Sequence, residues 1–163
     1  MAESHAGKEF SRTPTLEDLV ELCRNLNSVG AKYVVIGGFA VIHYGFVRGT
    51  GDIDLLVHHS EQNISRIQRG LMYLPDQAAK DLNLTDVKEY HVVRVADEIV
   101  VDLIEKAGDV TYQQVKDHIV YEMISGVTIP FLSIEWLIQT KLTYREKDLI
   151  DRRFLEDILK YKE

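Results

Sequence analysis

The chain contains a single cysteine, Cys23, and no apolar run that approaches the roughly 20 residues needed to span a membrane. One cysteine excludes an internal disulfide framework, and no spacing of cysteine and histidine is typical of a zinc site. No signal-peptide pattern precedes Thr15. Together these absences lead us to expect a soluble cytoplasmic protein without a membrane partner.

An excess of positive charge is also lacking. The formal net charge is −7, and the basic side chains gather toward the end of the sequence: residues 141–163 carry seven basic and six acidic side chains, whereas the rest of the chain carries twelve and twenty. The sequence therefore predicts no general basic surface for nucleic acid. An RNA partner would need a local basic site, for which the candidates are Arg48, Lys141, Arg145, Arg152 and Arg153.

The remaining composition is that of an ordinary globular domain. With 163 residues, of which 45% are hydrophobic and 28% charged, the chain can bury one substantial core and is too short for two domains. Residues 1–14 are polar and largely without pattern, so we expect a flexible N-terminal arm there. Residues 15–163 are expected to form the domain.

Hydrophobic periodicity and turn residues predict a succession of helices and strands. Thr15 to Asp18 has the pattern of a capped helix start, and the helical period continues to about Val29. After this helix we expect a buried strand over 32–36, a short helix over 39–44, a strand over 52–57, a helix over 60–74 and a helical turn over 75–80.

The second half of the chain predicts two antiparallel strand pairs. One pair comprises β-rich runs over 87–95 and 99–104, and the other flanks Ser125-Gly126 with runs over 119–123 and 127–131. A short helix is expected over 111–118, and Ser133 begins a long helical stretch that breaks or bends near Lys147-Asp148. These elements predict an α/β (α+β) fold, a mixed twisted sheet with helices around it.

The most informative motif is Asp52-Ile53-Asp54, at the start of the second expected strand. Strand side chains alternate between faces, so Asp52 and Asp54 point the same way. Two anions so close repel one another and raise each other's pKa unless a cation lies between them. Aspartate is also a poor strand former. The pair therefore indicates a divalent metal site, with solvated residues at a strand start as the alternative.

Gly37-Gly38 ends the first apolar strand and opens the short helix that follows it. Glycine lets the backbone approach a ligand closely, and free N–H groups at such a point can bind phosphate. A tight turn without a ligand is the alternative explanation for the same pair. A metal site combined with a phosphate cradle points to nucleotidyl transfer.

The order and spacing of these motifs resemble the DNA polymerase β-like nucleotidyltransferase superfamily. Its signature is an apolar residue with Gly-Gly or Gly-Ser, a spacer of about a dozen residues, and then Asp-x-Asp or Asp-x-Glu. Here Ile36-Gly37-Gly38 is followed by thirteen residues and then by Asp52-Ile53-Asp54. With Arg48 and Thr50 before the acidic strand, the chain is most similar to the small prokaryotic "minimal" members, among them toxins of type IV toxin–antitoxin systems.

The resemblance implies transfer of an NMP group from an NTP, such as ATP, to an acceptor hydroxyl with release of pyrophosphate. Mg²⁺, with Mn²⁺ as the other possibility, would be bound by Asp52, Asp54 and a third carboxylate on a later strand. Asp102 is the expected third ligand and catalytic residue, because it stands alone within an apolar strand pattern. The alternative third ligands are Asp97, Glu98 and Glu105.

The expected nucleotide-binding residues are Gly37, Gly38, Arg48, Thr50 and Lys141. Arg48 could equally neutralise Asp52, and Thr50 could bond its own loop. Lys141 is expected on the apolar face of a helix, where a cation is costly unless it reaches solvent or meets an anion. Similar enzymes use a helix lysine to hold the β- and γ-phosphates.

Three further residues are expected to have structural roles. For Arg145, an ion pair with Asp148 or Glu146 on its own segment is favoured over a second phosphate contact. His43 and Tyr44, on the short helix, are expected to be half-buried with their polar atoms satisfied.

The acceptor stays open at this level. It could be RNA such as a tRNA 3′ end, a protein hydroxyl, or a small hydroxylated molecule. The alternative function is a non-catalytic nucleotide-binding or antitoxin-like interaction module, paired in a two-gene system with a HEPN-type RNase or a cognate antitoxin. The chain has no arginine followed four to six residues later by histidine, so it lacks the HEPN nuclease motif itself. Three intact carboxylates favour the enzyme over the module.

Overall fold

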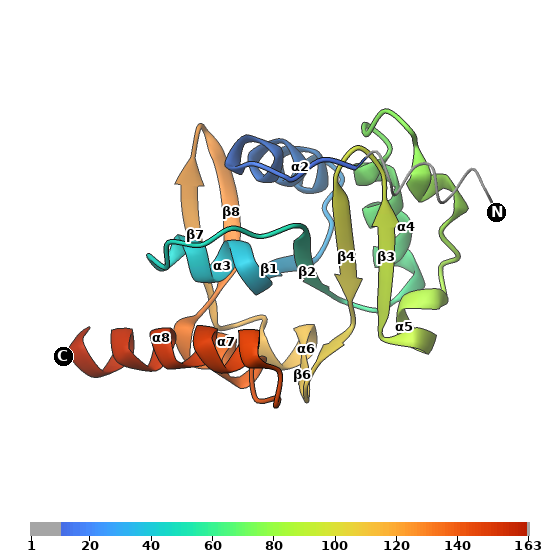
Figure 1. Cartoon of the computed structure of the whole chain (residues 1–163). Helices are drawn as coiled ribbons and strands as arrows, with labels where there is room; N and C mark the ends of the chain where they lie inside the picture. The colour runs from blue at the N-terminus through green and yellow to red at the C-terminus, as the bar shows by residue number, and fades with distance from the viewer. Residues whose placement is uncertain (1–10, 163) are drawn as a thin grey trace.

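The structure, a computed structural model, describes residues 11–162, which form one six-stranded sheet with helices around it (Figure 1). The strands β2 and β4 run parallel, as do β1 and β8, and every other neighbouring pair is antiparallel. This mixed sheet confirms the predicted fold class. The strand order is β3 (Val92–Ala96), β4 (Val100–Ile104), β2 (Ile53–Val57), β1 (Tyr33–Ile36), β8 (Val127–Leu132) and β7 (Ile119–Ile124).

The central strands are built from β-branched and aliphatic residues because both faces of the sheet are covered there. All four residues of β1 are buried, and in β2 Asp54 alone is partly exposed. The helix α3 (Gly37–His43) packs against β1 and β2. It begins two residues earlier than its predicted start, so Gly37 and Gly38 are its first residues.

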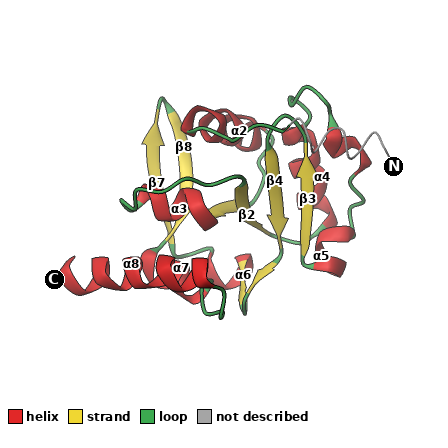
Figure 2. Cartoon of the chain, viewed as in Figure 1, coloured by secondary structure: helices red, strands yellow, loops and turns green. Residues whose placement is uncertain are grey.

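Two longer helices pack against each other beside the sheet (Figure 2). In α2 (Leu16–Ser28), Thr15 and Asp18 form the predicted capping box. In α4 (Glu61–Leu71), the Ser60 hydroxyl accepts a hydrogen bond from the N–H of Asn63. The buried Asn63 side chain also bonds both backbone groups of Lys32, which fixes α4 to the start of β1.

The two predicted strand pairs are present, but residues 87–90 do not belong to the first of them. They lie in a short helix, α5 (Asp86–Tyr90), and His91 ends this helix at φ 68° before β3 begins. Only Val87 of these helical residues is buried, so one turn of helix satisfies its burial without a strand. The predicted strand over 87–95 is therefore wrong for its first half.

The C-terminal helical stretch breaks earlier than predicted. The helix α7 (Ile134–Gln139), capped by Ser133, ends at Thr140, and α8 (Glu146–Lys162) starts after a turn. The Thr140 hydroxyl donates to the carbonyl of Leu137, and the Thr143 hydroxyl donates to Asp148. Such side-chain bonds compete with helix continuation. A break near Lys147-Asp148 is thus wrong, and Lys141 lies in the turn rather than on a helix.

The remaining elements are short: the 3₁₀ helix η1 (Ala78–Asp81), α6 (Tyr112–Val115), and the small strands β5 (Lys106–Ala107) and β6 (Val110–Thr111). Most of the predicted N-terminal arm lies outside the described residues. The described part contacts the β3–β4 hairpin, where the N–H of Arg12 donates to the carbonyl of Glu98. Among the described residues, no helix combines the length and apolar character that crossing a membrane requires.

Candidate active site

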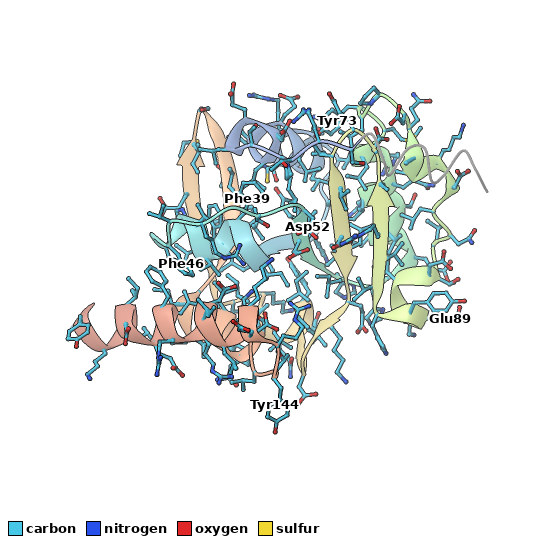
Figure 3. All side chains as sticks on the ribbon, viewed as in Figure 1. Phe39, Phe46, Asp52, Tyr73, Glu89 and Tyr144 are labelled. Atoms are coloured by element: carbon cyan, nitrogen blue, oxygen red, sulfur yellow. The ribbon has the colours of Figure 1, made fainter. Side chains whose placement is uncertain are left out.

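Strand register brings the predicted carboxylates together on one face of the sheet. Asp54 of β2 lies directly beside Asp102 of β4 in the parallel pair, and Asp52 stands two residues before Asp54 on the same face. One carboxylate oxygen from each of the three lies within 4.8 Å of the others. Asp102 is buried, and the other two are partly buried. Figure 3 labels Asp52 near the middle of the molecule.

The pKa values of two carboxylates in this cluster are raised, as expected for neighbouring anions. Burial and the charges of Asp52 and Asp102 together raise the pKa of Asp54 to about 7, although the charge of Lys141 opposes the rise. Burial also raises the pKa of Asp52, with a further contribution from Asp102 and opposition from Arg94. A cation that entered the cluster would relieve this repulsion.

The three alternative ligands lie elsewhere and have other partners. Asp97 is buried and accepts hydrogen bonds from the backbone N–H groups of Asp76, Ala78 and Glu98. Glu98 pairs with Arg12 at 3.2 Å, and Glu105 contacts His91 at 2.7 Å. None of the three is part of the carboxylate cluster, so Asp102 is the acidic residue placed to complete it.

Gly37 and Gly38 are in contact with the acidic strand and with the loop before it. Gly37 has φ +69°, and a Cβ atom added there would meet the Asp54 carboxylate, with its Cβ and Cγ at 2.8 Å. A Cβ on Gly38 would meet the Thr50 hydroxyl, with Thr50 Cβ at 2.6 Å and an Arg48 Nη1 at 2.9 Å. Gly37 is therefore needed for packing against Asp54, and Gly38 for packing against the loop before β2, whether or not a phosphate binds there.

Arg48 and Thr50 are held by protein groups. The Arg48 guanidinium donates two hydrogen bonds of 3.0 Å to the two oxygens of Asp151 on α8, and a third to the carbonyl of Gly49. The Thr50 hydroxyl donates to the carbonyl of Asp52 at 3.2 Å. These contacts fix the loop before β2, which carries the first of the carboxylates.

Lys141 is buried although it lies in a turn. Its ammonium is 3.1 Å from Asp151 and 3.7 Å from Asp148, and its charge also acts on Asp54. Burial alone would raise the pKa of Asp151, but hydrogen bonds from Arg48 and the charge of Lys141 hold it below its usual value. Arg145 pairs with Asp148, which is the ion pair on its own segment that the sequence favoured.

The short helix α3 ends in two half-buried aromatic residues. The His43 ring stacks on Phe131 with the centroids 3.9 Å apart, and the Tyr44 hydroxyl donates to the carbonyl of Leu132 at 2.7 Å. Both residues are half-buried, as expected, and the Tyr44 hydroxyl has the polar partner that its expected structural role requires.

Sequence reasoning missed one residue of the cluster, Arg94 on β3. It lies opposite Asp102 in the antiparallel pair, and its guanidinium donates to both oxygens of Asp102 and to Asp52. Part of a signal for it was present: counting outward from residues 96–98, between the two predicted strands, puts Arg94 on the same face as Asp102 but opposite Val100. The actual turn lies one residue later, and the observed register pairs Arg94 with Asp102.

A hollow of about 450 Å³ opens between the loop after α3 and the first turns of α8. Phe46 and Ile150 provide apolar walls, and Arg48, Lys147 and Asp151 provide charged ones. Figure 3 labels Phe46 above α8. The charge of Lys147, one of the lining residues, acts on Asp52, so the hollow lies within electrostatic reach of the carboxylates. A volume of this size is in the range of small-molecule sites.

A mixed sheet with Asp-x-Asp at the start of one strand, Gly-Gly directly after the neighbouring strand and a third aspartate on the strand at the other side is the architecture of a nucleotidyltransferase. Residues 15–163 match a family described as a nucleotidyl transferase of unknown function (DUF2204), and the chain belongs to that family. No curated protein matches the chain.

Solved structures share this fold at low sequence identity. One, a Thermotoga maritima protein assigned as a nucleotidyltransferase, superposes with a TM-score of 0.55 and 18% identity, over 87% of this chain and 92% of that one. Another, an antigenic nucleotidyltransferase-like protein from Paracoccidioides brasiliensis, has a TM-score of 0.51 and 18% identity, over 91% of this chain and 78% of its own.

Proposed function

We propose that this nucleotidyltransferase is Mg²⁺-dependent and moves an NMP group from an NTP to an acceptor hydroxyl, releasing pyrophosphate. The observation that carries the proposal is the meeting of Asp52, Asp54 and Asp102, whose oxygens come within 4.8 Å of one another from two neighbouring strands. Hard carboxylate oxygens are the ligands that Mg²⁺ prefers, and Mn²⁺ accepts the same set. The donor set therefore fits the cation.

The chemistry of in-line displacement needs charge stabilisation on both sides of the phosphorus. Bound at the three aspartates, a pair of Mg²⁺ ions would supply that stabilisation to the attacking and the leaving oxygen. In our proposal Asp52 and Asp54 bind on the triphosphate side. Asp102 stands on the strand farther from Gly37 and faces the acceptor.

The triphosphate would be oriented by the backbone of Gly37 and Gly38 and by Lys141, with Arg48 and Thr50 supporting the loop between them. The nucleoside fits the hollow walled by Phe46 and Ile150, because a base and ribose present both apolar faces and polar edges. Arg48 and Lys141 are satisfied by Asp151, so each would contact phosphate with its remaining N–H donors.

Incubation with α-labelled NTP, Mg²⁺ and a cell extract tests the proposal. We expect label in an acceptor and expect chelation of the divalent cation to abolish it. Label in RNA would favour a toxin-like enzyme with a cognate partner, label in a protein band would favour AMPylation, and label in a small molecule would favour a modifying enzyme. Tight NTP binding without transfer to any fraction would support the interaction module instead.

Replacing Asp102 with alanine is expected to separate chemistry from binding. In our proposal Asp102 serves the acceptor side, so the variant should lose transfer by a larger factor than it loses NTP affinity. Transfer rate and NTP dissociation constant, measured on the same preparation, decide this. An equal loss in both quantities would place Asp102 on the triphosphate side of the cluster.

Replacing Lys141 with alanine is expected to weaken NTP binding about tenfold and to lower the free energy of unfolding by about 3–5 kcal/mol, because Asp151 and Asp148 lose a buried partner. The matched control is Arg145→Ala, which removes an exposed partner of the same Asp148 and should cost under about 1 kcal/mol. Unchanged NTP affinity in the folded Lys141 variant would leave this lysine a structural role alone.

A further inference from the structure

Arg94 makes hydrogen bonds to two of the three aspartates in the carboxylate cluster. Its Nε donates to Asp102 Oδ1 at 2.9 Å, and its Nη2 donates to Asp102 Oδ2 at 3.0 Å and to Asp52 Oδ2 at 3.1 Å. A single guanidinium thus engages both oxygens of one proposed metal ligand and one oxygen of another. It supplies positive charge where two acidic side chains repel each other.

A divalent cation would use the same oxygens. Each of the three aspartates offers the cluster one ligand atom, and Asp102 has no oxygen that Arg94 leaves free of a hydrogen bond. Metal–oxygen distances of about 2.1 Å would bring Mg²⁺ close to the guanidinium, and their like charges would repel each other. Full occupancy by both cations is therefore unfavourable.

The exposure of the two nearby arginines shows which of them can move. The Arg48 side chain is 14% exposed and is held by the fully buried Asp151, so it is fixed within the structure. The Arg94 side chain is 52% exposed and lies on an outer strand of the sheet. It can rotate into solvent without uncovering the core, because a long charged side chain readily keeps its head group in water.

We propose that Arg94 is a displaceable counter-ion of the active site: it neutralises Asp102 and Asp52 until a divalent cation takes their oxygens and releases it. This inference rests on the proposed metal site. It makes metal affinity the result of a competition rather than of the carboxylates alone. The residue then positions the ligands, because it holds Asp52 and Asp102 together before the cation arrives.

Mn²⁺ alone is a suitable probe, because its binding is read directly by electron paramagnetic resonance without any nucleotide. Arg94→Gln should bind Mn²⁺ about tenfold more tightly than the unmodified protein, and Arg94→Lys should fall between the two. The matched control is Lys147→Gln, which removes an equal charge that acts on Asp52, from an exposed residue. Its effect should be smaller, about twofold at most.

Thermal unfolding adds a second measurement. With the divalent cation chelated, Arg94→Gln should unfold at a lower temperature than the unmodified protein, and saturating Mn²⁺ should close that gap. An arginine that acted only as a structural ion pair would leave the gap unchanged by Mn²⁺.

The failures of the two proposals can be told apart. If the unmodified protein binds Mn²⁺ and Arg94→Gln binds it no more tightly than Lys147→Gln, the counter-ion role is refuted while the metal site stands. If neither the unmodified protein nor Arg94→Gln binds Mn²⁺, the metal site itself is refuted, and the counter-ion role with it.

Discussion

Asp54→Asn should reduce nucleotidyl transfer by about 10³-fold, the equivalent of ~4 kcal/mol, and at the same time stabilise the protein without its metal. The loss of activity follows from the proposed role of Asp54 as a ligand. The gain in stability follows from its surroundings, because burial and two neighbouring aspartates raise its pKa to about 7. A neutral amide of the same shape escapes that repulsion.

The pH dependence has a definite sign. Because the folded pKa of Asp54 lies above its unfolded value, the folded chain binds more protons between about pH 4 and pH 7, and stability falls as the pH rises through that window. Asp54→Asn should lack this fall and exceed the unmodified protein by about 1–3 kcal/mol at pH 8 with the divalent cation chelated. Chemical denaturation across this pH range measures both quantities.

A second buried carboxylate provides the control for this prediction. Asp97 accepts three backbone hydrogen bonds, so Asp97→Asn should destabilise the protein at pH 8 by about 1–3 kcal/mol, the opposite sign. Adding Mg²⁺ with NTP should raise the unfolding temperature of the unmodified protein but not that of Asp54→Asn. Lower stability of Asp54→Asn than of the unmodified protein at pH 8 would contradict the strained cluster.

Gly37→Ala is expected to be the most destabilising small substitution near the site. The added methyl would force apart the backbone of α3 and the Asp54 side chain, whose Cβ and Cγ lie 2.8 Å from the ideal Cβ position. Overpacking of this kind costs about 1–3 kcal/mol, and the positive φ adds roughly 1 kcal/mol for any residue with a side chain. We expect a total loss of about 2–4 kcal/mol and a displaced Asp54.

Gly30→Ala is the matched control, because Gly30 has nearly the same backbone angle, φ +72°, and nothing within 4 Å of the added methyl. It should lose roughly 1 kcal/mol from the backbone alone. The difference between the two variants in urea denaturation then measures the contact with Asp54. Equal losses would mean that α3 shifts freely and that Gly37 does not constrain the carboxylate.

Local sequence signals were sufficient where the chain turns back on itself. The Ser125-Gly126 pair predicted the β7–β8 hairpin, and both residues have positive φ, 51° and 79°, as the tight hairpin turn requires. The same kind of reasoning failed at Val87 and at the helix break, where a single buried residue and two threonine hydroxyls decided between structures of similar propensity. Such choices depend on tertiary partners that local patterns do not contain.

The candidate site likewise has a part that could be predicted from the sequence and a part that could not. The Asp-x-Asp motif, the isolated position of Asp102 within an apolar strand pattern and the family resemblance were enough to predict that Asp52, Asp54 and Asp102 would gather. The partners of Arg48 and Lys141 could not be predicted. Asp151 meets these two side chains only when α8 packs against the loop before β2. Helical periodicity put Lys141 on an apolar face, and it is indeed buried, but in a turn and with two aspartates as partners.

The two parallel strand pairs also determine when, during synthesis, the site can exist. β1 cannot form its parallel pair until β8 has been synthesised, because Val35 pairs with Phe131. In the same way β2 needs β4, because Asp54 pairs with Asp102. Parallel pairing of distant segments is slow because loop closure must precede the contacts that reward it. A nascent chain that has left the ribosome only as far as residue 90 therefore carries Asp-x-Asp with no neighbouring strand for its third carboxylate. Metal affinity should appear late in translation, after the β3–β4 hairpin has emerged and delivered Asp102 and Arg94 together.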